Sequence, residues 1–379
     1  MIFFKPIYYI FINVIYSILS VVSCIVPKKK GLWIFSSWFG KKFSDNPYYF
    51  YRYCSDMNDP NLRLIWILKD QHVVKKLNNM GVESYYTYSL KGLYYQLRAE
   101  ICFFTHSLFS DFFSGFISRT TKRCNFWHGI PLKKIGYDDS MNSGNMKYFQ
   151  GNLKTKYLYN EWYTYFISSG NLYSRMLSKA FAIDESTIIE VGFPRSEVFL
   201  NSKRNDKTIV YMPTFRGNAF EKYDLIEEAK IDLYETNVKL KELGLNLIIR
   251  LHPANFFCSK DIDYSNISFD ESDGFDEVLS RACFLITDYS SVMFDFYLTG
   301  KPIFFFPYDL ESYLKKDRSL YFEYSNVIPK ESTFNSWLDI FSEDVFSKDF
   351  NFNFEFASKF YDRGNIEEPC KKLMELLLK

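Results

Sequence analysis

The stretch that decides the fold is Phe126-Trp127-His128-Gly129-Ile130-Pro131-Leu132-Lys133-Lys134. Its apolar entry, its histidine and the glycine and proline that follow indicate a strand ending in a turn. Three further stretches share this plan, a short apolar strand that runs into a loop or a helix start: Tyr211-Met212-Pro213-Thr214-Phe215-Arg216, Arg250-Leu251-His252-Pro253 and Thr287-Asp288-Tyr289-Ser290-Ser291. In α/β proteins ligands bind at the carboxyl ends of strands. The pattern therefore predicts a site assembled from several strand ends.

Short apolar runs alternate with amphipathic stretches from Gly31 onward, which is typical of parallel sheets covered by helices. The predicted strands are 33–36, 63–68, 100–105, 124–127, 165–167, 188–191, 208–211, 247–250, 283–287 and 302–306. A polar stretch at 201–207 separates two such series, so we expect an N-terminal domain over 31–205 and a C-terminal domain over 206–379. We expect the last helix, near 367–378, to cross back onto the first domain. The predicted fold class is α/β and GT-B-like, with two doubly wound Rossmann-like domains facing a cleft and an N-terminal membrane-associated helix.

The N-terminus differs from the rest of the chain. Residues 7–26 are mostly apolar, and Lys28-Lys29-Lys30 follow at once. A signal peptide fits poorly, because its basic cluster would precede the apolar run. A spanning anchor, an interfacial helix and a buried first helix stay open. We predict that residues 1–30 anchor the protein on the cytoplasmic side of the cell membrane, because the basic cluster holds the following domain there.

Composition excludes several classes of protein. The net charge of +1 gives no global field for nucleic acid. The seven cysteines are scattered without a CxxC pair, so neither a zinc site nor a disulfide framework is expected. No Walker, GxGxxG or DxD sequence appears, which disfavours P-loop enzymes, dehydrogenases and metal-bridged sugar transferases. We expect no metal and no cofactor.

Two of the four histidines lie in the motifs. His128, at a turn after a strand, has the pKa range of a general base that takes a proton from an attacking hydroxyl, and Lys133 lies where it can bind phosphate or acceptor charge. Strand alternation puts Arg250 and His252 on one face, which suits a diphosphate. The alternatives are a structural histidine beneath a loop for His128 and a loop-capping pair for Arg250 and His252.

The other candidates surround a predicted helix start. Thr287 ends a strand, Ser290 is a natural N-cap, and Ser290 with Ser291 predicts a phosphate cradle at the helix N-terminus. Asp295, one turn later, is either a ligand of ribose hydroxyls or an exposed helix carboxylate. Arg216 is either a phosphate clamp or a solvated loop residue.

Together these strings resemble the CDP-glycerol glycerophosphotransferase family, the teichoic-acid primases and polymerases. The resemblance runs from about residue 31 to residue 313, and its most specific parts are the strings at 128–136 and 287–295. It also includes residues 36–37, 45–47, 192–195, 212–216, 250–253, 301–302 and 308–311. Phe215 stands where the family commonly has tryptophan. Ile130 stands where it more often has threonine, a change that bears on acceptor recognition.

The resemblance implies a membrane-associated GT-B-type enzyme. His128 matches the family's proposed catalytic base, His252 matches the histidine near the diphosphate, and Arg250, Ser290 and Ser291 match the nucleotide-phosphate site. The expected reaction moves glycerol phosphate, or another alditol phosphate, from CDP-glycerol to a lipid-linked glycan acceptor and releases CMP. The chain lacks the extra region of the long polymerases, which favours addition of one or a few units. A GT-B glycosyltransferase that uses a nucleotide sugar and a non-catalytic membrane scaffold are the alternatives.

Overall fold

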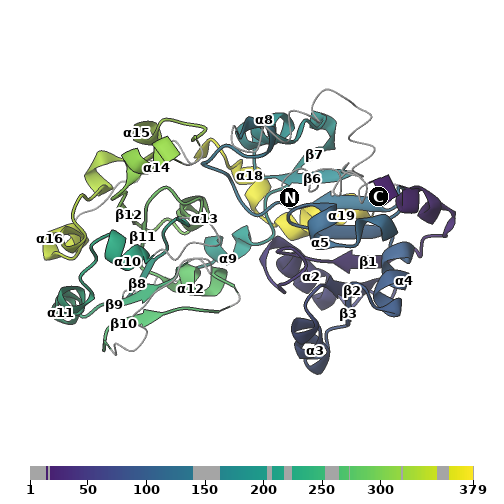
Figure 1. The fold of residues 1–379 in the computed structure, drawn as a ribbon, viewed down its shortest axis with the longest axis horizontal. Helices are drawn as coiled ribbons and strands as arrows, with labels where there is room; N and C mark the ends of the chain where they lie inside the picture. Colours follow the sequence, from purple (N-terminus) through teal and green to yellow (C-terminus); the bar gives the residue numbers. More distant parts are fainter. Residues whose placement is uncertain are drawn as a thin grey trace, which may run out of the picture.

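The computed structural model describes residues 14–15, 18–139, 163–202, 207–216, 224–251, 264–272, 274–316, 319–347 and 358–378. They form two lobes, each built on a parallel sheet (Figure 1). The N-terminal lobe contains residues 18–202 and the C-terminal segment 358–378. The C-terminal lobe contains residues 207–347.

The N-terminal sheet has seven parallel strands in the order β3-β2-β1-β4-β5-β6-β7. The strands are β1 Leu32–Phe35, β2 Arg63–Leu68, β3 Ser84–Tyr86, β4 Ile101–Phe104, β5 Lys122–Asn125, β6 Tyr165–Ser168 and β7 Ile188–Glu190. The central strands are near-continuous apolar runs, because helices cover both faces of a parallel sheet. The strand order reverses between β1 and β4, as in a doubly wound Rossmann-like fold.

Aromatic side chains fill much of this lobe's core. Along β1, Trp33 and Phe35 face one side of the sheet and pack with Phe50 of α2, while Ile34 faces the other side. Phe35 stacks on Phe103 of the neighbouring strand, with ring centroids 4.7 Å apart. Part of the chain's large aromatic content thus serves as packing volume on the two buried faces of this sheet.

Helices connect these strands, and the end of the chain returns to them. The helices before the second sheet are α2 Asp45–Asp56, α3 Gln71–Asn79, α4 Leu90–Arg98, α5 Leu108–Asp111, α8 Asn171–Phe181 and α9 Ser196–Leu200. After the second lobe, α18 Arg363–Ile366 and α19 Pro369–Leu377 cross back, and α19 packs on α2 (Figure 1). The expected return of the last helix to the first lobe is confirmed.

The C-terminal sheet has five parallel strands in the order β10-β9-β8-β11-β12. The strands are β8 Thr208–Tyr211, β9 Asn246–Ile249, β10 Ile267–Phe269, β11 Phe284–Thr287 and β12 Ile303–Phe305. The helices of this lobe are α10 Leu225–Glu228, α11 Leu233–Leu243, α12 Asp276–Arg281, α13 Val292–Tyr297, α14 Leu310–Lys316, α15 Tyr324–Val327 and α16 Glu343–Ser347. Its order reverses between β8 and β11, which repeats the plan of the first lobe.

Each predicted strand is found, with its ends shifted by two residues at most. Two strands were missed, β3 and β10, and both lie at the outer edge of a sheet. Of the predicted N-terminal anchor, residues 1–13, 16 and 17 lie outside the described residues. Within the described part of the chain, no helix combines the length and the apolar character needed to cross a bilayer.

Candidate active site

Three of the four sequence motifs lie at or next to the points where the two sheets reverse their strand order, whereas Arg250 of the fourth follows β9. In the N-terminal lobe, Trp38 follows β1, His106 follows β4 and His128 follows the adjacent β5. In the C-terminal lobe, Arg216 follows β8 and Asp288 follows β11. Both positions are switch points, where open α/β sheets bind ligands. The architecture thus brings together side chains that are far apart in the sequence.

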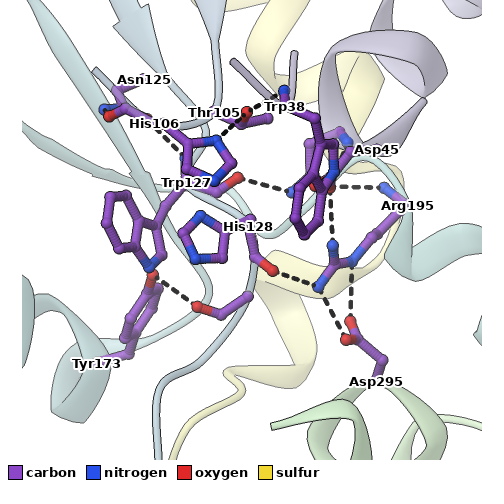
Figure 2. Close-up of polar contacts among 12 residues, drawn as sticks. Trp38, Asp45, Thr105, His106, Asn125, Trp127, His128, Tyr173, Arg195 and Asp295 are labelled. Atoms are coloured by element: carbon purple, nitrogen blue, oxygen red, sulfur yellow. Dashed lines mark hydrogen bonds and ion pairs between the residues drawn. The ribbon is translucent and has the colours of Figure 1, made fainter. Parts of the chain in front are cut away.

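His128 lies among aromatic rings in the N-terminal lobe (Figure 2). Its ring stacks on that of His106, with centroids 4.4 Å apart and planes 16° apart. The Trp127 ring is 4.2 Å away and the Trp38 ring 5.9 Å away, on opposite sides in Figure 2. The histidine is therefore held by flat apolar faces, and no carboxylate is hydrogen-bonded to its ring among the described residues.

The surroundings of His128 keep its ring neutral. Burial, and next the positive charge of Arg195, lower its pKa to about 4, while a hydrogen bond with the Thr105 backbone opposes them. Nδ1 of His128 is buried and has no hydrogen-bond partner among the described residues. A neutral imidazole can accept a proton on its unprotonated nitrogen. A buried polar atom without a partner is unfavourable, so Nδ1 is well placed to gain one from a substrate.

Arg195 joins the two lobes beneath His128 (Figure 2). Its guanidinium pairs with Asp45 of α2 at 2.7 Å and makes two bonds of 2.9 and 2.8 Å to Asp295 of α13. It also donates to the carbonyl of His128 at 3.0 Å, and a Cβ on Gly129 would lie 2.7 Å from its Nη2. Arg195 is 1 % exposed. One buried cation therefore holds the His128 turn and both lobes.

A third carboxyl lies near this ion-pair cluster. Asp276 begins α12 in the C-terminal lobe, and its hydrogen bond with Tyr49 of α2 spans the two lobes. Its Oδ1 is buried without a hydrogen-bond partner among the described residues. Burial raises the pKa of Asp276 to about 7, and the charges of Asp45 and Asp295 act in the same direction, whereas Arg195 opposes them. Arg195 therefore pairs with Asp45 and Asp295, and the carboxyl of Asp276 is partly protonated near neutrality.

The backbone around this site is strained. Trp38, Phe39, Asp45 and Trp127 all have positive φ, at 47°, 61°, 67° and 53°. Such conformations cost of order 1–3 kcal/mol for a bulky residue and persist where the surroundings fix them. Here they aim Trp38 and Trp127 at the His128 ring. This concentration of strain supports a functional site at the strand ends.

In the C-terminal lobe, Arg216 is buried against two carboxylates. It bonds Asp288 at 2.7 Å and makes two bonds of 2.7 and 2.8 Å to Asp309. Asp288 also accepts from the Thr214 backbone N–H at 3.0 Å. The alternative of a solvated loop residue is wrong for Arg216, because the side chain is 4 % exposed, and its role as a phosphate clamp stays a prediction. The arginine shapes the switch point, and a phosphate would have to share it with both carboxylates.

The loop after His128 extends to the C-terminal lobe. Lys134 donates its backbone N–H to Ser319 at 2.9 Å, and Tyr321 donates to the carbonyl of Leu132 at 2.9 Å. Lys133 lies over the ring of Tyr313 at 5.0 Å and more distantly over that of Tyr289. The lysine predicted to bind phosphate is thus in contact with tyrosines of the other lobe. A pocket opens after β12 and is lined by residues 307–312 and 315.

The remaining predicted residues occupy several different settings. Thr287 is buried and donates to the carbonyl of Met212 at 2.7 Å. Arg250 bonds Asp270 and donates to the Ser272 carbonyl at 2.9 Å. His252 lies outside the described residues. The contacts predicted between these residues and a nucleotide stay predictions.

Two details of the helix start at α13 differ from expectation. The helix begins at Val292 with Ser291 as its N-cap and no side-chain capping bond, so the assignment of Ser290 as the N-cap is wrong. Ser290 is half-buried and Ser291 is exposed. Asp295 is buried and paired with Arg195, so the alternative of an exposed carboxylate is wrong, and both of its oxygens are already bonded.

Sequence reasoning missed His106 and treated Arg195 only as part of a turn. His106 is the first polar ring after an apolar strand, the same signal that identified His128. Comparing the residues after neighbouring strands would have found it. Arg195 carries no local signal beyond its turn, because its role depends on the approach of the second lobe.

The two parallel sheets, with functional residues at both switch points, define a GT-B-like α/β protein. Comparison with known proteins specifies the family. The profile of the CDP-glycerol:poly(glycerophosphate) glycerophosphotransferase family matches residues 18–349, and the chain belongs to this family. It is accordingly an enzyme of the CDP-glycerol glycerophosphotransferase type, as the sequence predicted.

Individual proteins similar to this chain carry names that agree with the family assignment. A teichoic acid poly(glycerol phosphate) polymerase of Staphylococcus epidermidis is 31 % identical over 331 residues, which cover 78 % of this chain and 43 % of that protein. The polymerase of the same name from Bacillus spizizenii is 30 % identical over 342 residues, 83 % of each chain. The chain thus spans under half of the first relative and most of the second.

A solved structure shares the fold. The wall teichoic acid polymerase TagF has a TM-score of 0.70 at 23 % identity, and the match covers 99 % of this chain and 95 % of that one. A variant of TagF soaked with CDPG gives a TM-score of 0.71.

Proposed function

We propose that this enzyme transfers glycerol phosphate from CDP-glycerol to a hydroxyl of a lipid-linked cell-surface glycopolymer and releases CMP. Membership of the family and the CDPG soak of TagF support the donor. The observation that carries the catalytic part is the neutral His128 ring, whose buried Nδ1 has no hydrogen-bond partner in the described part of the chain.

In the proposed reaction the acceptor oxygen attacks the phosphorus that bears the glycerol. A new P–O bond forms, the bond to the CMP phosphate breaks, and the acceptor proton passes to Nδ1 of His128. Charge builds on the phosphorus oxygens, so positioning and electrostatic stabilisation supply most of the rate. We assign the donor to the C-terminal lobe, around the Ser290–Ser291 turn and Arg250, with His252 beside the diphosphate. This part rests on the family's motif.

The pH dependence follows from the His128 environment. The base works only when neutral, so activity should fail as pH drops through its pKa. Because that pKa is about 4, kcat/KM should stay level from about pH 8 to about pH 5 and fall only below it. A fall centred near pH 6.5, the range of an unperturbed histidine, would contradict the assigned environment.

The test is CMP release by the full chain, offered CDP-glycerol, CDP-ribitol and nucleotide sugars in turn with a membrane lipid extract as acceptor. General-base help is worth roughly 10²–10⁴-fold, so His128→Ala should lower turnover at least a hundredfold. His72→Ala is the matched control, because His72 is exposed on α3. CMP from a nucleotide sugar alone would favour the glycosyltransferase alternative. Near-normal turnover of His128→Ala would refute the role of the base.

We further propose that the N-terminal segment attaches the enzyme to the cytoplasmic side of the membrane. In its described part, Ile18, Val21, Val22 and Ile25 are 57 %, 48 %, 53 % and 81 % exposed. Lys28-Lys29-Lys30 follow. An apolar face next to a basic cluster suits an anionic bilayer surface. Deleting residues 1–26 should abolish flotation with anionic vesicles and leave CDP-glycerol binding intact. Continued flotation of the truncated protein would place the attachment elsewhere.

A further inference from the structure

His106 is a second histidine of the site, and neither motif nor sequence order pointed to it. It follows β4, whereas His128 follows β5, and the pairing of these strands places the two rings face to face (Figure 2). The near-parallel stack, at 4.4 Å and 16°, brings the two rings into contact over their faces. The orientation of the His128 ring therefore depends on where His106 is fixed.

The protein fixes His106 through contacts that need no substrate. Its Nδ1 is 2.8 Å from Oγ1 of Thr105, which also accepts from the Trp38 backbone N–H at 3.1 Å. Its own backbone N–H donates to Asp111 at 2.9 Å, and its carbonyl accepts from Asn125 at 3.0 Å. Backbone and ring are thus both anchored to neighbouring strand ends. This is the arrangement expected of a support for a second residue.

His106 is unsuited to carry a proton itself. Burial, and next the nearby His128, lower its pKa to about 3, and Asp45 only partly opposes them. Its ring is neutral throughout the working range, and two adjacent imidazolium ions would repel each other. When His128 takes a proton, its new charge instead meets the π-faces of His106 and Trp127. Aromatic faces stabilise such cations by an amount that corresponds to roughly tenfold in rate.

We propose that His106 is a positioning residue, a neutral aromatic platform that orients the His128 ring and stabilises the imidazolium formed during transfer. The proposal rests on the proposed function of His128 as the base. It predicts that the flat ring at position 106 matters most, and that the ring nitrogens contribute little beyond the contact of Nδ1 with Thr105.

Three variants separate these features: His106→Phe keeps a flat ring, while His106→Gln and His106→Ala remove it. The phenylalanine variant should retain kcat within about threefold. The other two should lose at least about tenfold in kcat, with KM for CDP-glycerol unchanged. An equal loss of kcat in all three variants would overturn the proposal and would indicate that His106 carries a proton. A normal kcat in the glutamine and alanine variants would overturn it as well, because the ring would then be dispensable. Melting temperatures of all variants control for folding.

A second readout does not depend on turnover. The chain has four histidines, so ring NMR of histidine-labelled protein gives few signals, and the loss of one in His128→Asn identifies His128. That signal should be sharp in the wild type and in His106→Phe, and shifted or broadened in His106→Gln. An unchanged signal in His106→Gln would refute positioning. Because this experiment needs no donor, it separates failure of the platform from failure of the proposed reaction.

Discussion

The carboxyl of Asp276 should make the stability of this protein fall between mildly acidic and mildly basic pH. The folded protein holds its pKa at about 7, whereas an aspartate in an unfolded chain has a pKa of about 3.9. Between these values the folded state keeps a proton that the unfolded state has released. The stabilisation is therefore present at low pH and is lost as pH rises through the folded-state pKa.

The magnitude follows from the two pKa values. Between about pH 5.5 and about pH 8.5 this one group should lower the free energy of unfolding by about 2 kcal/mol. Asp276→Asn cannot ionise, so the variant should lack this part of the pH dependence. The loss of a hydrogen bond in the variant adds a cost that is constant with pH and cancels in the slope.

The assay is urea unfolding, followed by tryptophan fluorescence, at both pH values. Asp56→Asn is the matched control, since Asp56 is exposed at the end of α2 and should leave the slope unchanged. Tyr49→Phe removes a hydrogen bond that lowers the pKa of Asp276, so it should move the loss of stability to higher pH. A pH slope in Asp276→Asn equal to that of the wild type would refute the reasoning.

Two further predictions concern the ion-pair cluster. Arg195→Ala leaves Asp45 and Asp295 buried without the arginine's charge, so it should lower the free energy of unfolding in urea by roughly 3–5 kcal/mol. Arg195→Lys should lose less of that free energy than Arg195→Ala but not match the wild type, because lysine lacks the planar guanidinium that bonds both carboxylates. An unchanged unfolding midpoint in Arg195→Ala would contradict the role of the cluster. Gly129→Ala places a Cβ 2.7 Å from Nη2 of Arg195 at φ +130°, so its melting temperature should fall well below that of Gly81→Ala, whose Cβ meets nothing within 4 Å at φ +79°. Equal melting temperatures would show that the guanidinium moves aside at no cost.

The strand pattern of this fold could be predicted because its central strands are buried on both faces. Such strands are continuous apolar runs, and the sequence Arg63–Leu68 gave β2 with its observed ends. The edge strands β3 and β10 gave no such signal. Each has three residues and is only partly buried, so neither an apolar run nor an alternation develops. Their existence depends on a neighbouring strand that offers free hydrogen-bonding groups.

The site was predictable only where one motif carries its own chemistry. His128 could be found because it stands in a distinctive turn. Arg195 could not, because its role comes from Asp295, 100 positions away in the sequence. His106 could have been found by comparing strand ends, but its stacking on a ring 22 positions away could not. Arg216 was predicted as a candidate phosphate clamp, and that role stays a prediction. No local pattern reveals that two carboxylates distant in the sequence pair with it.

The return of α19 to the first lobe has a consequence for synthesis on the ribosome. Cys370, Leu373, Met374 and Leu377 are buried in the same core as Phe50 of α2. The first lobe is therefore completed only after the second lobe has been synthesised, and until then α19 does not cover the apolar side of α2. During that interval the nascent chain is exposed to aggregation and to chaperones, as expected for lobes that cannot close in order of synthesis. A chain that stops short of α19 would lose part of the core of the lobe that holds His128, even though α19 and His128 lie far apart in the sequence.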